Sequence, residues 1–339
     1  MTGIRVLARR LNMSIGTVSR ALNGKPGVNA ETRKRVIAMA QATGYVPNAA
    51  GSNLRKGRTQ TIGLMIRTGP TSLGAGKFFL AVSGAMQEVL ADHNIDLALL
   101  PIHGAMDPLA YLRRMLQRGA MDGLILTSTE IDDECIALLA ASSLPFMTLG
   151  RSSTPGDYLW MDLDFEQGAR KAVTRLAELG HRRIAVCVPE GKLNLSQLYR
   201  ETWRQTMAEN DLPASDDISF AGSSCEDGGA EVAARLLTLS DRPTAIIMCS
   251  EPMISGFCGG LMAANLRPGT DLSIIGLRQS SLLRHLRPPI SCFELCLTTL
   301  GRDLANAMLA LTYSINADPM PTSGLIPMTY VETASVQQI

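Results

Sequence analysis

The sequence predicts two parts of different fold class: a small all-α head at the amino-terminal end and a larger α/β core with parallel, doubly wound sheets. Basic side chains are concentrated in the first 60 residues, which separates the head from the rest of the 339-residue chain. From Ile62 onward, short apolar runs alternate with helical patterns, and repeated β-α units of this kind form parallel sheets covered by helices. The chain length suits one small domain followed by a two-lobed one.

The charge of the chain is divided unevenly between these two parts. Residues 1–60 contain eleven Lys and Arg and a single acidic residue, Glu31, which gives a net charge of +10. The remaining residues contain 21 basic and 30 acidic side chains, a net charge of −9, so the overall charge of +1 hides the asymmetry. DNA carries one negative charge per ~1.7 Å of helix axis, so the cationic head indicates a nucleic-acid partner.

Three helical patterns account for the head. Apolar residues at helical spacing predict a first helix over residues 4–11, and Asn12 tolerates the left-handed conformation of a tight turn. Ser14 can cap a second helix, whose apolar face contains Val18, Ala21 and Leu22. A third helix is expected over residues 30–41, with Val36, Ile37 and Ala40 facing inward and Arg33, Lys34 and Arg35 facing outward.

This order of helix, turn, helix and basic third helix is the helix-turn-helix arrangement. In that arrangement, the second helix enters the major groove of DNA with its amino-terminal end first, and its early side chains meet the base edges. Ile15, Gly16, Ser19 and Arg20 are left pointing outward from this helix.

The core is expected to contain seven buried strands and at least six helices. The apolar runs predict strands at 62–66, 96–100, 123–127, 146–150, 184–188, 245–249 and 272–276. Helical patterns occupy residues 78–92, 107–118, 166–179, 228–239, 252–264 and 299–311.

Several motifs occur in a recognisable order along the chain. They are TVSRALNG at 17–24, VNAETRKRV at 28–36, GYVPN at 44–48, TIGL at 61–64, LAELGHRRIAV at 176–186, LRPGTDLSIIG at 266–276 and TTLGRDLANAML at 298–309. On these residues the chain resembles the lactose-repressor/galactose-repressor (LacI-type) family of bacterial transcription regulators. The resemblance covers nearly the whole chain.

The resemblance implies a division into three segments. Residues 1–46 form the helix-turn-helix DNA-binding domain, 47–58 a hinge helix or linker, and 59–339 a ligand-binding and dimerisation core. The core is expected to have two lobes like those of periplasmic sugar-binding proteins, with a small-molecule cleft between them. Lobe 1 is expected to contain about 60–161 and 292–321, and lobe 2 about 162–290 and 323–339, so that the chain crosses between lobes near 161, 291 and 322.

The resemblance also implies which head residues contact DNA. Ile15, Gly16 and Arg20 occupy the base-reading positions, where an arginine can pair bidentately with guanine. A phosphate or solvated role for Arg20 remains open. The remaining expected contacts, largely to phosphate, are Ser14, Thr17, Ser19, Asn23, Asn29 and Thr32.

In this family the hinge folds when two copies pair over DNA, and its leucine wedges into the minor groove. That leucine is Leu54 here, with Arg55 beside it. Gly51 stands where the family usually has alanine, which lowers the helix propensity of the segment. A plain flexible linker is the alternative.

The cleft is where the sequence departs from its sugar-binding relatives. Leu277 and Arg278 follow the strand SIIG where an aspartate is usual, and Ser250 and Glu251 replace an Asn-Asp pair. The usual cleft arginine falls on Tyr199. The predicted ligand contacts are Phe79, Arg151, Tyr199, Arg200, Trp203, Ser250, Glu251 and Arg278, while the usual aromatic and amide positions fall on Ser224 and Leu295.

Two arginines at cleft-facing strand ends, Arg151 and Arg278, suggest an acidic ligand such as a sugar acid or sugar phosphate. Two alternatives remain open. Arg278 can instead pair with Glu251 across the cleft, or the cleft can be degenerate and bind no effector.

Nucleotide, metal and membrane functions are not expected. The segment GAGKFF at 74–79 follows a strand, but Thr71 and Phe78 break the phosphate-loop pattern and Phe79 breaks the dinucleotide fingerprint. The four histidines lack metal-ligand spacing, and the seven scattered cysteines suit reduced thiols in the cytoplasm. The sequence shows no signal peptide, no membrane span and no cofactor motif.

The expected function is therefore a sequence-specific, dimeric DNA-binding transcription regulator, a repressor, that binds a near-palindromic double-stranded operator. A small carbohydrate-type effector in the cleft, a sugar or sugar derivative, is expected to control its affinity for that operator. The alternative is a small-molecule binding protein or an α/β enzyme with an incidental basic amino-terminal domain.

Overall fold

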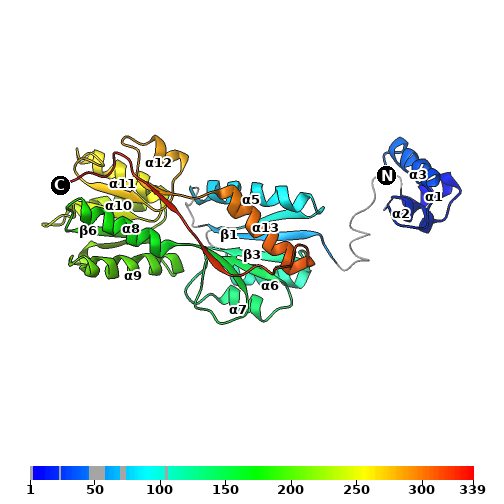
Figure 1. Ribbon diagram of the computed structural model, residues 1–339, viewed down its shortest axis with the longest axis horizontal. Helices are drawn as coiled ribbons and strands as arrows, with labels where there is room; N and C mark the ends of the chain where they lie inside the picture. Colours follow the sequence, from blue (N-terminus) through cyan, green and yellow to red (C-terminus); the bar gives the residue numbers. More distant parts are fainter. Residues whose placement is uncertain (1–2, 23, 46–57, 69–73, 104–105) are drawn as a thin grey trace. The chain divides into compact units, whose positions relative to one another are not determined.

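The structure is a computed structural model that describes residues 3–22, 24–45, 58–68, 74–103 and 106–339. The chain divides into two compact units, Met1–Thr59 and Gln60–Ile339, which are described separately (Figure 1).

The head is a three-helix unit with helices α1 (Ile4–Leu11), α2 (Ile15–Leu22) and α3 (Ala30–Ala42). Asn12 ends α1 in the left-handed conformation, with φ 52° and ψ 44°, and this allows the sharp turn into α2. The three helices share one core, which consists of Leu7, Ala8, Leu11, Val18, Ala21, Val36 and Ala40. The fold of the head therefore agrees with the pattern read from the sequence.

One predicted orientation on α3 is wrong. Ile37 is 41% exposed because Val36 and Ala40, one helical turn apart, already define the inward face. Arg33, predicted to face largely outward, is half-buried, and its Nη2 donates a hydrogen bond to the Lys25 carbonyl oxygen at 2.9 Å, which joins α3 to the loop before it.

Lobe 1 of the core contains a six-stranded parallel sheet in the order β11-β5-β4-β3-β1-β2. Its strands are β1 (Thr61–Thr68), β2 (Asp96–His103), β3 (Gly123–Thr127), β4 (Phe146–Leu149), β5 (Leu159–Leu163) and β11 (Gly324–Ile326). Its helices are α5 (Gly74–Ala91), α6 (Pro108–Arg118), α7 (Glu134–Ala140) and α13 (Leu297–Tyr313). Consecutive residues of β1 point to opposite faces of the sheet. Leu64 packs into the hydrophobic core under α5 and α13, and Met65 packs into the core under α6 and α7.

Lobe 2 contains a four-stranded parallel sheet in the order β7-β6-β8-β9. Its strands are β6 (Ile184–Pro189), β7 (Ser219–Gly222), β8 (Ala245–Met248) and β9 (Ser273–Gly276). Its helices are α8 (Phe165–Glu178), α9 (Asn194–Glu209), α10 (Glu226–Leu237), α11 (Glu251–Ala263) and α12 (Ser281–His285), with a 3₁₀ turn at Asp216–Ile218. Strands β6, β8 and β9 are buried along their whole length, which explains their largely apolar sequences.

The chain crosses between the lobes three times. Strands β5 and β11 belong to the lobe 1 sheet, so two crossings come after Leu163 and after Ile326, a few residues later than predicted. Near the remaining crossing, β10 (Cys292–Glu294) pairs antiparallel with β12 (Thr329–Val331), and this two-stranded ribbon accompanies the connection (Figure 1). The sequence patterns did not reveal β5, because three of its five residues are only half-buried.

Candidate functional site

The exposed surface of α2 is the first candidate site. Ser14 caps this helix, since its Oγ accepts a hydrogen bond from the Thr17 N–H at 3.0 Å and lies 2.9 Å from Thr17 Oγ1. Val18 and Ala21 anchor the opposite face in the head core, while Ile15 remains 46% exposed. The amino-terminal end of α2 is thus anchored through its buried face and exposed to solvent on the opposite face.

Gly16 and Arg20 lie one turn apart on that exposed face. A Cβ at position 16 would lie 3.9 Å from Arg20 Nη2 and 3.7 Å from Ser14 Oγ, so the guanidinium extends back over the glycine. Arg20 is exposed and has no carboxylate partner among the described residues. Its fork of N–H donors is therefore directed along the amino-terminal part of α2 and can meet a base edge or phosphate.

A second helix start lies in the same unit, at α3. Asn29 Oδ1 caps α3 by accepting a hydrogen bond from the Thr32 N–H at 2.7 Å. Capping leaves the Asn29 amide nitrogen and the Thr32 hydroxyl as the groups that could face a phosphate. Of the other predicted DNA contacts, Ser19 is half-buried on α2, whereas Asn23, Leu54 and Arg55 lie outside the described residues.

The second candidate site is a cavity of about 570 Å³ lined by both lobes of the core. Its lining includes five of the predicted ligand contacts, Phe79, Arg151, Ser250, Glu251 and Arg278, together with Arg67, Phe78, Asp162, Glu190 and Ser224. Strand β1 contributes Arg67, and the segments that follow β3, β4, β6, β7, β8 and β9 contribute most of the other polar groups. Ligand sites of doubly wound sheets lie at the carboxyl ends of strands, as here.

An adjoining cavity of about 820 Å³ shares three lining residues with the first: Phe78, Glu251 and Arg278. Lys77 from α5, Arg284 and His285 from α12, and the segment 294–297 complete much of its wall. Leu295, which stands at the usual amide position, lines this second cavity.

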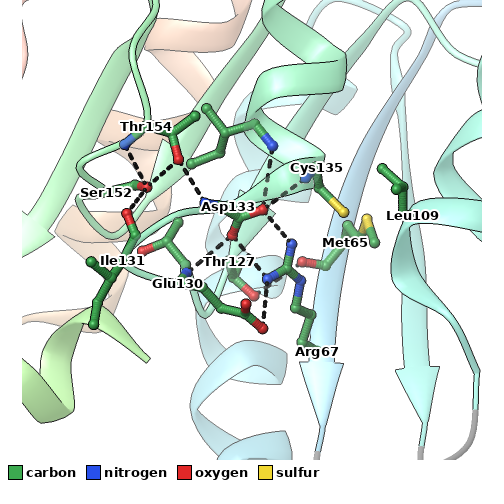
Figure 2. Close-up of polar contacts among 12 residues, drawn as sticks. Met65, Arg67, Leu109, Thr127, Glu130, Ile131, Asp133, Cys135, Ser152 and Thr154 are labelled. Carbon is green, nitrogen blue, oxygen red and sulfur yellow. Dashed lines mark hydrogen bonds and ion pairs between the residues drawn. The ribbon is translucent and has the colours of Figure 1, made fainter. Parts of the chain in front are cut away.

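Arg67 is held inside the first cavity by a buried carboxylate (Figure 2). Its Nη1 and Nη2 donate to Asp133 Oδ2 and Oδ1 at 2.9 and 2.8 Å, and Glu130 lies 3.7 Å away. Asp133 also caps α7 by accepting hydrogen bonds from the Cys135 and Ile136 N–H groups. The Asp133 side chain is 1% exposed, so this pair acts as a structural support for the cavity wall.

Arg151 is also occupied, which contradicts its predicted role in a two-arginine fork. Its Nε donates to Asp162 Oδ2 at 3.0 Å and its Nη2 to Glu166 Oε2 at 2.5 Å. Burial raises the pKa of the Asp162 carboxyl to about 6, although hydrogen bonds from Arg151 oppose this shift. With two carboxylate partners, Arg151 has little remaining capacity for an acidic ligand.

Arg278 differs from the other two cleft arginines. Among the described residues it forms no ion pair, so the alternative of a direct pair with Glu251 is not realised. Instead its guanidinium carbon lies 4.0 Å from the centre of the Phe78 ring, a cation–π contact. Burial lowers the pKa of Arg278 to about 10, with Glu251 partly opposing the shift, so the side chain remains a cation at neutral pH.

Backbone hydrogen bonds also join the two lobes at the edge of the cleft. The Ile131 N–H donates to the Lys192 carbonyl oxygen, and the Asn194 N–H donates to the Thr129 carbonyl oxygen, both at 3.0 Å. Glu130 and Leu193 form an antiparallel bridge between these two bonds. Residues 129–131 of lobe 1 and 192–194 of lobe 2 are called the cross-lobe bridge below.

Known proteins resemble both units of the chain. Residues 4–48 match the family model for bacterial regulatory proteins of the lacI family, and residues 173–336 match a periplasmic binding protein-like domain. The HTH-type transcriptional regulator AglR of Rhizobium meliloti is 32% identical over 307 residues, which cover 90% of this chain and 84% of AglR. The chain belongs to the lacI family.

The members of this lacI family are transcriptional regulators, and this chain is accordingly a DNA-binding transcriptional regulator rather than an enzyme. RafR of Escherichia coli is 33% identical over 264 residues, covering 78% of this chain and 76% of RafR. In fold, the chain matches the lac repressor dimer bound to operator and the anti-inducer ONPF, with a TM-score of 0.85, 20% identity and 99% coverage of both chains. The predicted fold class, a helix-turn-helix head with a periplasmic-binding-protein-like core, is confirmed.

Three residues at lacI-family ligand positions do not line the cavity, and for two of them, Tyr199 and Trp203, full burial contradicts their prediction as ligand contacts. Tyr199 and Trp203 are fully buried on the inner face of α9, where Trp203 Nε1 donates to the Ile184 carbonyl oxygen at 3.0 Å. Arg200, the third, is half-buried and absent from the lining of either cavity. An aromatic side chain where relatives have arginine is incorporated into the lobe 2 core.

Other cleft residues were missed from the sequence. Arg67 escaped notice because the predicted strand ended at Ile66, whereas β1 continues to Thr68 and places the arginine near its carboxyl end. Asp162 lies on the unpredicted strand β5, and Glu190 directly follows β6, where it accepts a hydrogen bond from Ser223 Oγ. Searching every strand end for charged residues would have found Arg67 and Glu190.

Within the described residues, no helix is long and apolar enough to cross a membrane. The same residues contain no group of three or more His, Cys, Asp or Glu side chains placed to hold a metal ion.

Proposed function

We propose that this chain is a dimeric repressor that binds a near-palindromic operator through the exposed face of α2. The observation that carries this proposal is the open amino-terminal half of α2, where Ile15 and Arg20 are exposed beside Gly16. We assign phosphate contacts to Ser14, Thr17 and Ser19 on the same turn and helix and to Asn29 and Thr32 at the start of α3. Asn23, Leu54 and Arg55 remain predicted contacts of the same interface. Two heads related by a two-fold axis would require two half-sites.

The proposal also includes a dimeric assembly and a cytoplasmic location. The lac repressor structure that this chain resembles in fold is a dimer on its operator. A chain that regulates transcription from bacterial DNA acts in the cytoplasm, and the seven free cysteines suit a reducing compartment.

The proposed effector is a small carbohydrate that carries one acidic group. CelR, similar in fold with a TM-score of 0.70 and 22% identity, has been solved with cellobiose. In this chain, Glu190 and Glu251 can accept hydrogen bonds from sugar hydroxyls, and Arg278 offers donors that no carboxylate occupies. Because Arg151 is already paired, a single acidic group suits the cleft better than two.

Random-site selection followed by a mobility-shift titration tests DNA recognition. Specific binding should recover a palindromic sequence and weaken with salt by ~0.9 log units per phosphate contact per log unit of salt. A protein that recovers no preferred sequence would contradict the repressor function.

Thermal-shift measurements with sugar acids, sugar phosphates and neutral sugars test the effector class. We expect stabilisation by an acidic sugar and loss of this preference in Arg278→Ala. Stabilisation by a neutral sugar that Arg278→Ala leaves unchanged would exclude the acidic class while keeping the regulator function.

A further inference from the structure

Phe78 and Arg278 belong to different lobes. Phe78 lies on α5, which packs against β1 and β2 of lobe 1, and Arg278 follows β9 of lobe 2. Their 4.0 Å contact therefore spans the cleft. The two residues also border both cavities, so the stacked pair lies at the boundary between the two spaces.

The backbone around Arg278 is fixed on both sides. The Leu277 N–H donates to the Met248 carbonyl oxygen, and the Gln279 N–H donates to the Phe293 carbonyl oxygen, both at 2.9 Å. Phe78 is itself supported by an edge-on contact with Phe79, with ring centres 5.1 Å apart. The hydrogen-bonded backbone on either side of Arg278 and the supported ring of Phe78 together restrict the conformations of the guanidinium.

Stacking on a ring uses the face of a guanidinium and leaves its in-plane N–H donors available. Since Arg278 has no ion pair among the described residues, these donors can bind a ligand. Separating the lobes would remove the ring from the guanidinium and release the side chain. The ability of Arg278 to bind would thus depend on the angle between the lobes.

We propose that Phe78 is a positioning residue that holds Arg278 ready for the effector only while the lobes are closed. The stack links occupation of the cleft to lobe angle, because a ligand on Arg278 favours the arrangement in which the stack exists. This inference rests on the proposed function in one respect, namely that Arg278 contacts the effector. The stack as a contact between lobes does not depend on that assignment.

The first experiment needs no effector. Spin labels at the exposed Gln117 of α6 and Gln205 of α9 report the distance between lobes in the full-length protein, in a Cys296→Ser background because Cys296 is exposed. Labelled protein is diluted with unlabelled protein so that one copy per dimer carries the pair. Phe78→Leu should lengthen or broaden the distance distribution, whereas Phe78→Tyr, which keeps the ring, should retain the wild-type distribution.

Modification of Arg278 by phenylglyoxal, followed by mass spectrometry, gives a second measurement on the same variants. Loss of the stack should raise the Arg278 modification rate by several-fold in Phe78→Leu and leave it unchanged in Phe78→Tyr. Wild-type distances and a wild-type modification rate in Phe78→Leu would overturn the proposal.

The two proposals can fail separately. If Phe78→Leu changes the distances but the thermal-shift series finds only neutral sugars that ignore Arg278, the acidic effector is wrong and the contact between lobes stands. If an acidic sugar binds through Arg278 and Phe78→Leu binds it with unchanged affinity, the positioning role is wrong and the effector class stands.

Discussion

The cations of the head and those of the core differ in their partners. In residues 3–22 and 24–45 no Lys or Arg forms an ion pair, and all of them except Arg33 are exposed. Within the described part of the core, nine arginines take part in ion pairs. Charge in the head is thus available to a partner molecule, while half of the arginines in the core are paired with carboxylates, and in the cleft Arg278 lacks the ion pair that Arg67 and Arg151 have.

Breaking the most buried ion pair of the core should produce the largest effect. Asp133→Ala leaves Arg67 with only the more distant Glu130 as an ion-pair partner, at 3.7 Å, and removes the cap of α7, so we expect the free energy of unfolding of the core to fall by about 3–5 kcal/mol. Chemical denaturation of the full-length protein measures this change.

An exposed ion pair serves as the control. Glu209→Ala breaks the pair with Arg170, in which both side chains are more than two-fifths exposed, and should change stability by less than about 1 kcal/mol. Asp133→Asn keeps the cap acceptor and should lie between the two. Equal small losses in Asp133→Ala and Glu209→Ala would mean that the buried pair has no special structural role.

Removing a head arginine should weaken DNA binding and leave the stability of the protein unchanged. Arg20→Ala should weaken specific operator binding by ~1–3 kcal/mol, roughly 5- to 150-fold, because one base contact is lost. Its melting temperature should stay that of the wild type, since Arg20 has no carboxylate partner. Mobility-shift titrations on selected and on random DNA separate the two effects, and an equal loss on both would assign Arg20 to phosphate.

The same difference explains what the sequence could predict. In the head, a single acidic residue among eleven cations leaves few internal partners, so the outward face of α2 could be assigned from helical spacing, although on α3 the same spacing placed the exposed Ile37 inward. In the cleft, the paired cations find their partners in other segments of the chain: Arg67 pairs with Asp133 and Arg151 with Asp162, and such pairing is invisible to local patterns. Buried strands were predictable because β6, β8 and β9 are largely apolar, whereas β5 and β11 are only partly buried.

The cross-lobe bridge provides a smaller and more local test of the core. Asn194→Pro removes the N–H that donates to Thr129, and proline is well tolerated at the first position of a helix such as α9. Leu193, with φ −58° and ψ 128°, already has a conformation that suits a residue before proline. The substitution should therefore remove one hydrogen bond between lobes without breaking the helix.

Loss of one such bond should increase opening of the bridge roughly five-fold. Hydrogen exchange at the Ile131 amide, which donates the other bond, should accelerate by that factor in Asn194→Pro. Asn194→Ala keeps the N–H and loses the same buried side chain, so it is the matched control. Identical exchange in the two variants would show that the bridge does not restrain the lobes.

The smallest effect is expected at Gly16, where the stability of the head and its recognition of bases can be measured separately. A Cβ there would have only ordinary contacts, at 3.7 Å with Ser14 Oγ and 3.9 Å with Arg20 Nη2, so Gly16→Ala should fit. Alanine in the first turns of α2 should stabilise the head by roughly 0.5–1 kcal/mol, because glycine loses more backbone entropy on folding. The melting temperature of the head should rise, while site selection reports any new preference at the base facing position 16. A stabilised head with unchanged base preference would mean that Gly16 takes no part in reading the operator. A stabilised head with a changed base preference would mean that Gly16 keeps the DNA-reading face of α2 free of a side chain and that this lowers the stability of the helix.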